Sequence, residues 1–360
     1  MGVKRQQRAA PTRQGAPTAT SAQRTFATFL ISTPCAFRGE FESDKLSIAQ
    51  VIKNIGDQRH FAEAGPFERH FYALHVQIHV HSPVVRYELD HELIVAVLSL
   101  IYGKSIQSHG QIWSSMGIWS LPDMLTIAPN DNYRLPCFGG DRTDWPSVSS
   151  SWESLADFRA LLPLMTHSAE DPIFRATRSY AEALRLLAID IEIAYFRLIQ
   201  ALESAAGAAK YSDEERFGHD QQLLSHVNWL ESDLGNRGRA TAKFLKDRLY
   251  QVKRGVSLWV RDHIGDNFFR SGKDTLQRSD LDTAISAAYA LRSGYVHTGL
   301  RFGRWVSPFG DPTGSNETVK VIPGLSEPGL EKILSAAPSF VGLERIVRAC
   351  LFGAIESKTQ

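Results

Sequence analysis

The spacing of apolar residues changes partway along this chain, and this change most restricts the folds available to it. In the segment Phe71–His81, apolar and polar residues alternate from Leu74 onward. That spacing is typical of a β-strand with one buried face. Beyond residue 171, apolar residues instead recur at every third or fourth position, as they do in amphipathic helices. We therefore predict an α+β fold, in which a mixed, β-containing N-terminal domain precedes an all-α helical bundle.

Composition indicates the boundaries of these parts. Residues 1–24 include no Asp or Glu and almost no large apolar residue, so we expect a disordered basic tail there. The consecutive glycines at 139–140 and the polar run 145–151 are typical of a boundary between domains. We therefore expect a mixed α/β N-terminal domain over residues 25–150 and a helical bundle domain over residues 151–360.

Capping residues predict where several helices begin and end. Asp90 can accept hydrogen bonds at a helix N-terminus and Gly103 can end a helix, which predicts a helix between them. Asp171 followed by Pro172 predicts the start of a long helix that runs to about Ala209. Further helices are predicted at 154–165, 218–232, 239–264, 279–296 and 339–357, the fourth of them capped by Ser279, and short strands are predicted within 110–136 and at 318–322.

Cysteine content and charge exclude several classes of protein. The 360 residues include three cysteines, Cys35, Cys137 and Cys350, without C-x-x-C spacing, which argues against a disulfide framework and a cysteine zinc site. The formal net charge of +1 argues against a generic polyanion binder. No apolar run of about 18 residues is present, so we expect a cytoplasmic protein without a membrane span. The sequence also lacks a P-loop, a dinucleotide fingerprint, H-E-x-x-H and G-x-S-x-G, so we expect no cofactor and no bound metal.

The best candidate for chemistry lies at the end of the helix predicted over 279–296, where Arg292 and His297 are five residues apart. Arginine offers a fixed charge to a phosphate oxygen, and histidine can exchange a proton near neutral pH. These two groups suffice in kind for metal-independent RNA cleavage. The ribose 2′-OH would be the nucleophile, His297 the acid or base, and Arg292 the stabiliser of the crowded phosphate. Ser293 could add a hydrogen bond.

The helical spacing of the two residues limits how they can cooperate. Five residues of ideal helix leave about 140° between Arg292 and His297. They can meet at one ligand only if the helix bends or ends between them, or if two subunits share the site; Gly294 and Gly299 make an ending here reasonable. The purely structural alternative is that an Arg and a His near a helix C-terminus interact favourably with the helix dipole.

The segment Ala290–Gly299, which reads ALRSGYVHTG, resembles the signature of the HEPN superfamily. In that family an Arg, four to six intervening residues and a His lie at the end of a bundle helix. The Arg-Ser pair, followed by an aliphatic residue, His and Gly, resembles the Apea-like branch in particular. The upstream segment Phe196–Ser204, which reads FRLIQALES, resembles the early helix of that branch. The resemblance covers roughly residues 172–357.

The resemblance implies a helical bundle that forms a homodimer and brings two Arg-x4-His motifs to a shared cleft. Family members are often metal-independent endoribonucleases of bacterial antiviral defence or toxin systems, and others bind RNA or nucleotides without cleaving. It thus implies RNA or a nucleotide as partner, and Arg292, His297, Ser293 and Glu203 as site residues. Many members have Asn, Asp or His where this chain has Ser293, a weaker orienting group. Glu203 either orients the site or pairs with an arginine of the bundle.

The predicted strand at 71–81 offers a separate hypothesis. His75, His79 and His81 share one face of that strand. Two of these imidazoles could hold zinc together with ligands from elsewhere, which would make the protein a metal enzyme. They could equally form the solvated face of an edge strand.

Basic and aromatic residues of the second half also leave two interpretations open. The helix predicted over 239–264 has a basic set that could follow an RNA backbone or form a solvated face. This set is Lys243, Lys246, Arg248, Lys253 and Arg254. Three tryptophans could stack on bases or anchor the core. They are Trp229, Trp259 and Trp305.

Overall fold

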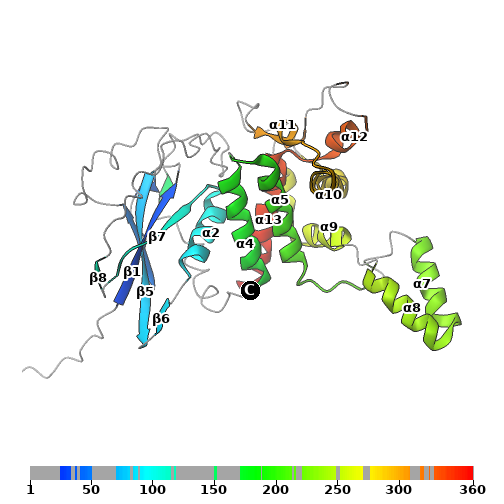
Figure 1. The fold of residues 1–360 in the computed structure, drawn as a ribbon, viewed down its shortest axis with the longest axis horizontal. Helices are drawn as coiled ribbons and strands as arrows, with labels where there is room; N and C mark the ends of the chain where they lie inside the picture. The colour runs from blue at the N-terminus through cyan, green and yellow to red at the C-terminus, as the bar shows by residue number, and fades with distance from the viewer. Residues whose placement is uncertain are drawn as a thin grey trace, which may run out of the picture.

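The computed structural model describes residues 25–33, 37–38, 41–50, 70–81, 84–87, 90–114, 117–118, 150–151, 171–187, 189–212, 215, 221–248, 252–270, 276–308, 317–319, 324 and 328–359. In these residues an antiparallel sheet occupies the N-terminal region and helices follow it (Figure 1). The α+β prediction is therefore confirmed.

Strand β1 (Thr25–Thr33) lies inside the sheet. It pairs antiparallel with β5 (His70–His81) on one side and with β7 (Gln107–Ser114) on the other. The order of strands is β3-β4-β5-β1-β7-β8, and β6 pairs with the end of β5. The shorter strands are β3 (Phe41–Glu42), β4 (Leu46–Gln50), β6 (Val84–Tyr87) and β8 (Gly117–Ile118), and a separate parallel pair is formed by β2 (Phe37–Arg38) and β9 (Ser150–Ser151).

The alternation predicted for β5 is confirmed where its side chains are described. Leu74, Val76 and Ile78 are buried in the core. His75 and Gln77 lie on the opposite face and are half-buried. A strand that buries every second side chain in this way has one face on the core of the protein.

Helix α2 (His91–Tyr102) lies between the sheet and the helical bundle (Figure 1). Its predicted ends are confirmed, because the Asp90 carboxylate accepts hydrogen bonds from the N–H groups of Glu92 and Leu93, and Gly103 follows with a φ of 61°. Every residue from Leu93 to Leu100 is buried. Burial around the whole helix indicates that it is covered on more than one side, and α4 (Pro172–Leu186) of the bundle covers part of it.

Arg348, in the last helix of the chain, connects the bundle to the C-terminal end of α2. Its Nε donates a hydrogen bond to the carbonyl oxygen of Leu100 at 2.7 Å, and a second guanidinium N–H donates to the carbonyl of Ile101. The last carbonyls of a helix have no partner within the helix. The C-terminal helix therefore satisfies backbone groups of the N-terminal region.

The bundle consists of helices that pack around a common apolar core. Its main members are α4 (Pro172–Leu186), α5 (Ile191–Ala206), α9 (Val252–His263), α10 (Leu281–Thr298) and α13 (Phe340–Thr359). Shorter elements are the 3-10 turns Asp266–Arg270 and Arg278–Asp280, and the helices α11 (Gly303–Val306) and α12 (Pro328–Ala336). Helix α13 confirms the helix predicted over 339–357.

Two helices that the sequence predicts as continuous are divided in the structure. The helix predicted from Asp171 is α4 followed by α5, because Asp190 caps a new helix by accepting a hydrogen bond from the Ile193 N–H. The division lets the two helices pack closely along each other. The helix predicted over 239–264 is α8 (Gly235–Arg248) followed by α9. Its predicted basic set therefore lies on two helices.

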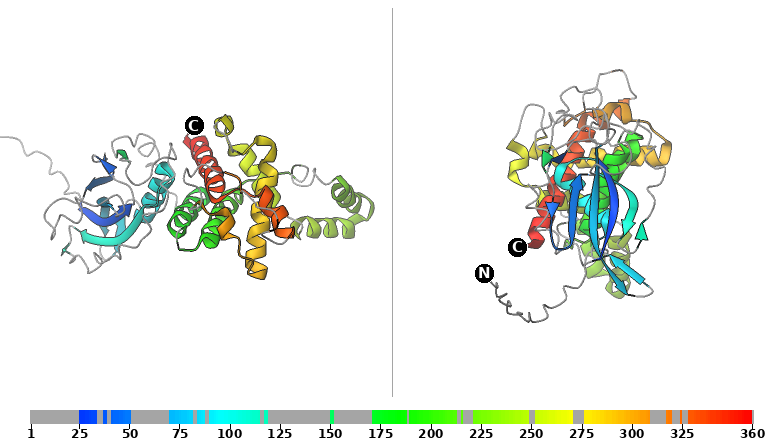
Figure 2. Two further views of the ribbon diagram at one scale, coloured as in Figure 1. Left: turned by 90° about the horizontal axis from the view of Figure 1, so that it is seen from above. Right: turned by 90° about the vertical axis from the view of Figure 1, so that its left-hand side faces the viewer.

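Helix α7 (Gln221–Asp233) and helix α8 form a hairpin that projects from the bundle (Figures 1 and 2). The two helices pack against each other. Among the described residues, no other helix or strand forms an extensive interface with either of them. Helix α7 agrees with most of the helix predicted over 218–232.

Some of the sequence interpretation concerns residues outside the described ranges. These are the tail at 1–24, most of the short strands within 110–136, the boundary residues 139–140 and 145–149, the helix at 154–165, Cys35, Cys137 and most of the strand at 318–322. Cys350 is described, and it is a buried free thiol. Of the helices that the structure describes, none has the length and apolar character needed to cross a bilayer.

Candidate active site

Helix α10 carries the candidate site at its C-terminal end. The N-cap predicted at Ser279 is wrong, because a 3-10 turn precedes the helix, Asp280 occupies the cap position, and the Ser279 hydroxyl donates to the Asp280 carboxylate at 2.9 Å. The helix ends at Thr298, and Gly299 follows in the left-handed conformation with a φ of 70°. Its N–H donates to the carbonyl oxygen of Tyr295 at 2.9 Å. A glycine is favoured at such a position because it has no Cβ to clash.

Arg292 is held by two side chains of α5. One of its terminal nitrogens lies 3.2 Å from a carboxylate oxygen of Glu203. Its guanidinium carbon lies 4.9 Å from the centre of the Phe196 ring. Phe196 and Glu203 are seven residues apart, which places them on one side of α5, two turns from each other. The Arg292 side chain is 32% exposed, so it is oriented by α5 and still reaches the surface.

Tyr289 completes the buried side of this arrangement. Its hydroxyl oxygen is buried, and burial together with the nearby Glu203 carboxylate raises the pKa of the phenol. Tyr289 lies three residues before Arg292, so both side chains reach the same region of α5. The phenol therefore stays neutral and forms part of the wall behind the guanidinium.

Ser293 and His297 lie on the solvent side of α10. Both residues are exposed. They are four residues apart, which puts them on one face, about one turn from each other. Val296 lies between Arg292 and His297 around the helix, and it is 55% exposed, unusually so for a large apolar side chain.

The structure does not bring Arg292 and His297 together within one chain. The helix continues past His297, so the ending that would let them converge comes too late in the sequence. Gly294 remains helical, and an added Cβ there would lie 3.1 Å from Leu300 Cδ2. Gly294 therefore gives room for the chain to fold back after the helix. Arg292 and His297 could meet at one ligand if the helix bent or ended between them, or if two subunits shared the site. The helix neither bends nor ends between them, so the shared site is the condition that is left.

Further basic residues follow the helix at this end. Arg301 is exposed, lies 3.6 Å from Glu192 and stands over the Tyr295 ring. Arg304 is exposed and stands over the Trp305 ring. The C-terminal end of a helix carries partial negative charge and repels anions. An anion at this end would therefore be held by guanidinium groups and not by the helix backbone.

The sequence interpretation named Arg292, Glu203, Ser293 and His297, and the structure pairs the first two. It places His297 and Ser293 together on a neighbouring face. The role of Phe196 was missed, although the residue lies in the segment that carries the resemblance. Its seven-residue spacing from Glu203 was the available signal. That spacing becomes informative only when the arginine that reaches both residues is known.

The histidines of β5 offer little support for a metal site. The Nδ1 atom of His75 lies 2.8 Å from the Thr28 hydroxyl, and burial lowers the pKa of this imidazole. His79 and His81 belong to the strand, but their side chains lie outside the description. In the part of the chain whose side chains are described, no group of three or more His, Cys, Asp or Glu residues is arranged to hold a metal ion.

The tryptophans have different environments. Trp259 is buried and stacks on His263 with ring centres 4.4 Å apart, so it belongs to the core. Trp305 is half-buried beneath Arg304. Trp229, in the hairpin, is 50% exposed. Of the three, Trp229 has the surface position that stacking on a base requires.

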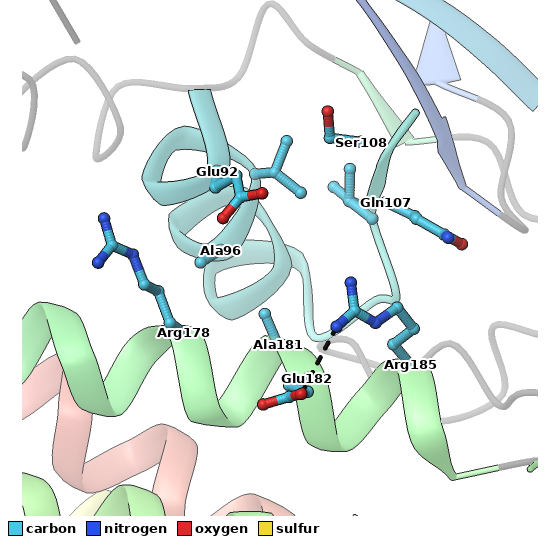
Figure 3. Close-up of a pocket in the computed structure, with 10 residues that line it drawn as sticks. Glu92, Ala96, Gln107, Ser108, Arg178, Ala181, Glu182 and Arg185 are labelled. Carbon is cyan, nitrogen blue, oxygen red and sulfur yellow. Dashed lines mark ion pairs between the residues drawn. The ribbon is translucent and has the colours of Figure 1, made fainter. Parts of the chain in front are cut away.

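A hollow with a volume of about 310 Å³ lies where α2, β7 and α4 meet (Figure 3). Arg178 and Arg185 of α4 reach toward it, and no sequence motif had indicated it. Arg178 forms an ion pair with Asp90, and Arg185 lies 3.7 Å from Glu182. Because each guanidinium faces a carboxylate, the hollow offers no excess positive charge to a phosphate.

The chain was compared with protein-family models, with curated proteins and with solved structures, and none of the three comparisons found a match.

Proposed function

We propose that this chain is a homodimeric, metal-independent endoribonuclease of the HEPN type. In the proposed dimer, each site combines Arg292 of one copy with the partner subunit's His297. The resemblance of Ala290–Gly299 to the HEPN signature supports this function. Such an enzyme would suit a cytoplasmic defence or toxin-like role, in which its activity must be restrained because cleavage of the cell's own RNA is harmful.

The observation that carries the proposal is the arrangement at the end of α10. Arg292 is oriented by Glu203 and Phe196 yet reaches the surface, while His297 is exposed on the next face. The two side chains diverge by about 140° within one helix. A two-fold contact across the intervening Val296 would bury that exposed apolar side chain and bring an arginine of one copy toward a histidine of the other.

The groups at this end of the helix, with water for the second proton transfer, account for the reaction. The ribose 2′-oxygen attacks the adjacent phosphorus, its proton is lost, and the bond from phosphorus to the 5′-oxygen breaks as that oxygen gains a proton. His297 acts as the acid or base in one of these transfers. Arg292 stabilises the negative charge on the five-coordinate phosphate, and Ser293 donates a hydrogen bond. The products are a 2′,3′-cyclic phosphate and a 5′-hydroxyl end.

Incubation of the protein with end-labelled single-stranded RNA in EDTA tests this function. The wild-type protein is expected to release products with 2′,3′-cyclic phosphate ends. His297→Ala is expected to lower the rate by about a hundredfold or more. Thr283→Ala, an exposed residue near the other end of α10, is the matched control and should cleave like the wild type. Cleavage that survives His297→Ala, or that stops with the chelator, contradicts the proposal.

A second function, in which the same site binds RNA or a nucleotide without cleaving it, is favoured by one observation. Arg292 is already paired with Glu203, whereas His297 has no part in that arrangement. In a binding module Arg292 would contribute most of the affinity and His297 little. Nucleotide or RNA binding that is lost in Arg292→Ala, kept in His297→Ala and never accompanied by cleavage selects this second function.

A further inference from the structure

The α7–α8 hairpin has an unusual concentration of exposed apolar side chains. Trp229 is 50% exposed, Leu234 is 48% exposed and Phe244 is 58% exposed. These three represent half of the large hydrophobic residues that are exposed in the described part of the chain. The hairpin also stands apart from the bundle (Figure 2). Its apolar residues therefore do not serve the core of this chain.

Helix α8 is strongly basic. Its fourteen residues, GNRGRATAKFLKDR, include five basic residues and a single acidic one. Arg237, Arg239 and Lys243 are exposed. Arg239 donates a hydrogen bond to Asn236 within its own helix. Among the described residues, neither Arg237 nor Lys243 forms an ion pair. The charges of Arg237 and Lys243 are therefore not neutralised by an ion pair within the described part of the chain.

The packing of α8 on α7 fixes which face of α8 is turned outward. Gly238 and Ala242 are buried, and they are four residues apart on one side of the helix. A Cβ added to Gly238 would lie 2.0 Å from the carbonyl oxygen of Leu230 in α7. The backbones of the two helices therefore approach closely here, and the opposite face of α8 is left to solvent.

On that open face the basic residues flank an aromatic ring. Arg237 and Phe244 are seven residues apart, so they lie along one edge of the face, about two turns from each other. Arg239 and Lys243 are four residues apart and lie along the other edge. The face thus presents three cations and one exposed ring. Trp229 is two residues from the buried Val227 and lies on the opposite side of the hairpin, so it is not part of this face.

We propose that the α7–α8 hairpin is a docking arm for single-stranded RNA. The cations would contact phosphates, and Phe244 would stack on an unpaired base. Single-stranded nucleic acid is favoured over duplex because stacking on a side chain requires a base that is free of its own stack. Phosphate contacts supply the affinity without sequence specificity, which suits an arm that gathers substrate.

The inference rests on the proposed function only for its choice of RNA as the ligand. The arm has no catalytic group of its own. It would raise the local concentration of RNA near the end of α10, because a tethered strand meets the site as an intramolecular partner. Binding by the arm can be measured in the His297→Ala protein, where no cleavage interferes.

Fluorescence anisotropy with a labelled oligouridine RNA of about 20 nucleotides tests the arm. The triple substitution Arg237→Gln, Arg239→Gln and Lys243→Gln is expected to remove most of the salt dependence of binding. Three phosphate contacts on a single strand correspond to a slope of about 2 in log affinity against log salt, or about a twentyfold loss for a fourfold rise in salt. Phe244→Ala is expected to weaken binding about tenfold at constant salt.

Two controls accompany these variants. Ser225→Ala changes an exposed, uncharged residue of α7 that lies away from this face of α8, and should leave affinity unchanged. A duplex of the same length should bind more weakly than the single strand and should not respond to Phe244→Ala. Circular dichroism checks that each variant keeps its helices.

The outcomes separate this inference from the proposed nuclease. Hairpin variants that bind RNA like the wild type overturn the arm, whether or not the protein cleaves. Loss of RNA binding in the hairpin variants, with no cleavage by the wild-type protein, supports the docking arm and contradicts the proposed nuclease function. Hairpin variants that convert a dimer to a monomer while RNA affinity stays constant overturn the arm and identify the face as an interface between copies.

Discussion

The end of α10 and the α7–α8 hairpin both combine basic and aromatic side chains, but they hold these side chains differently. Arg292 lies against the Phe196 ring and a carboxylate, and about two thirds of its side chain is covered. Arg237 and Lys243 are exposed on a projecting helix. An oriented guanidinium loses little further freedom when it binds one particular phosphate, which suits catalysis. Exposed charges act at longer range and suit capture of a strand.

The largest expected effect comes from mixing two inactive proteins. Arg292→Ala and His297→Ala should each abolish cleavage as homodimers. A mixture unfolded and refolded together should recover about a quarter of the wild-type rate, because half of the dimers are mixed and each has one intact shared site. The rate is measured on labelled RNA.

A mixture that recovers nothing while forming mixed dimers would place both groups of a site in one chain. The contrast between the two regions would then fail, since Arg292 would need no second copy. Refolded wild type is the control for losses during refolding.

A smaller effect is expected when the ion pair that orients Arg292 is removed. Glu203→Gln removes the charge that orients the guanidinium but keeps the shape of the side chain, and should lower cleavage about tenfold. Stability should change by about 1 kcal/mol or less, because the pair is partly exposed. The effect on cleavage is measured as kcat at saturating RNA and as kcat/KM at limiting RNA. The effect on stability is measured by a thermal melt.

Glu182→Gln provides a matched control, because Glu182 also pairs with an arginine but away from α10. It should leave cleavage unchanged. Equal losses in both variants would mean that Glu203 matters only for the stability of the bundle. Affinity for RNA should stay constant in Glu203→Gln if the hairpin does the capturing.

Two glycines, one near each region, are expected to affect stability and to leave the chemistry of the site unchanged. Gly303→Ala would bring a Cβ within 2.3 Å of Ile191 Cγ2, and Gly238→Ala would bring one within 2.0 Å of Leu230 O. Each crowding should cost about 1–3 kcal/mol. Gly303→Ala should lower the melting temperature of the whole bundle, whereas Gly238→Ala should loosen only the hairpin. Hydrogen exchange distinguishes loosening of the bundle from loosening of the hairpin. Loss of amide protection across the bundle in Gly238→Ala would show that the hairpin is not an independent unit.

Much of the fold follows from local signals in the sequence. The alternation in β5 and the caps of α2 at Asp90 and Gly103 identify those elements directly, because side-chain spacing and cap chemistry are local. The break at Asp190 was not predicted. Apolar residues keep helical spacing on both sides of it, and an aspartate inside such a pattern resembles an exposed helical residue until the packing of α4 on α5 is known.

The candidate site was predictable only in part. The chemistry of Arg292 and His297 is visible in the sequence, and so is their divergence around a helix. Their partners are not, because Glu203 and Phe196 lie about 90 residues upstream, and only the packing of α5 on α10 brings them to Arg292. The exposure of Val296 also depends on the fold, since the same residue type is more often buried.

The covering of α2 on both sides has a mechanical consequence. The helix is shared by the sheet and the bundle, and Arg348 holds its last carbonyls. A displacement of the sheet, for instance when something binds its outer face, would push α2 against α4 and pull on α13 at the same moment. By the same reasoning, a fragment of residues 1–150 would lack the bundle that covers one side of α2, and it should self-associate in solution.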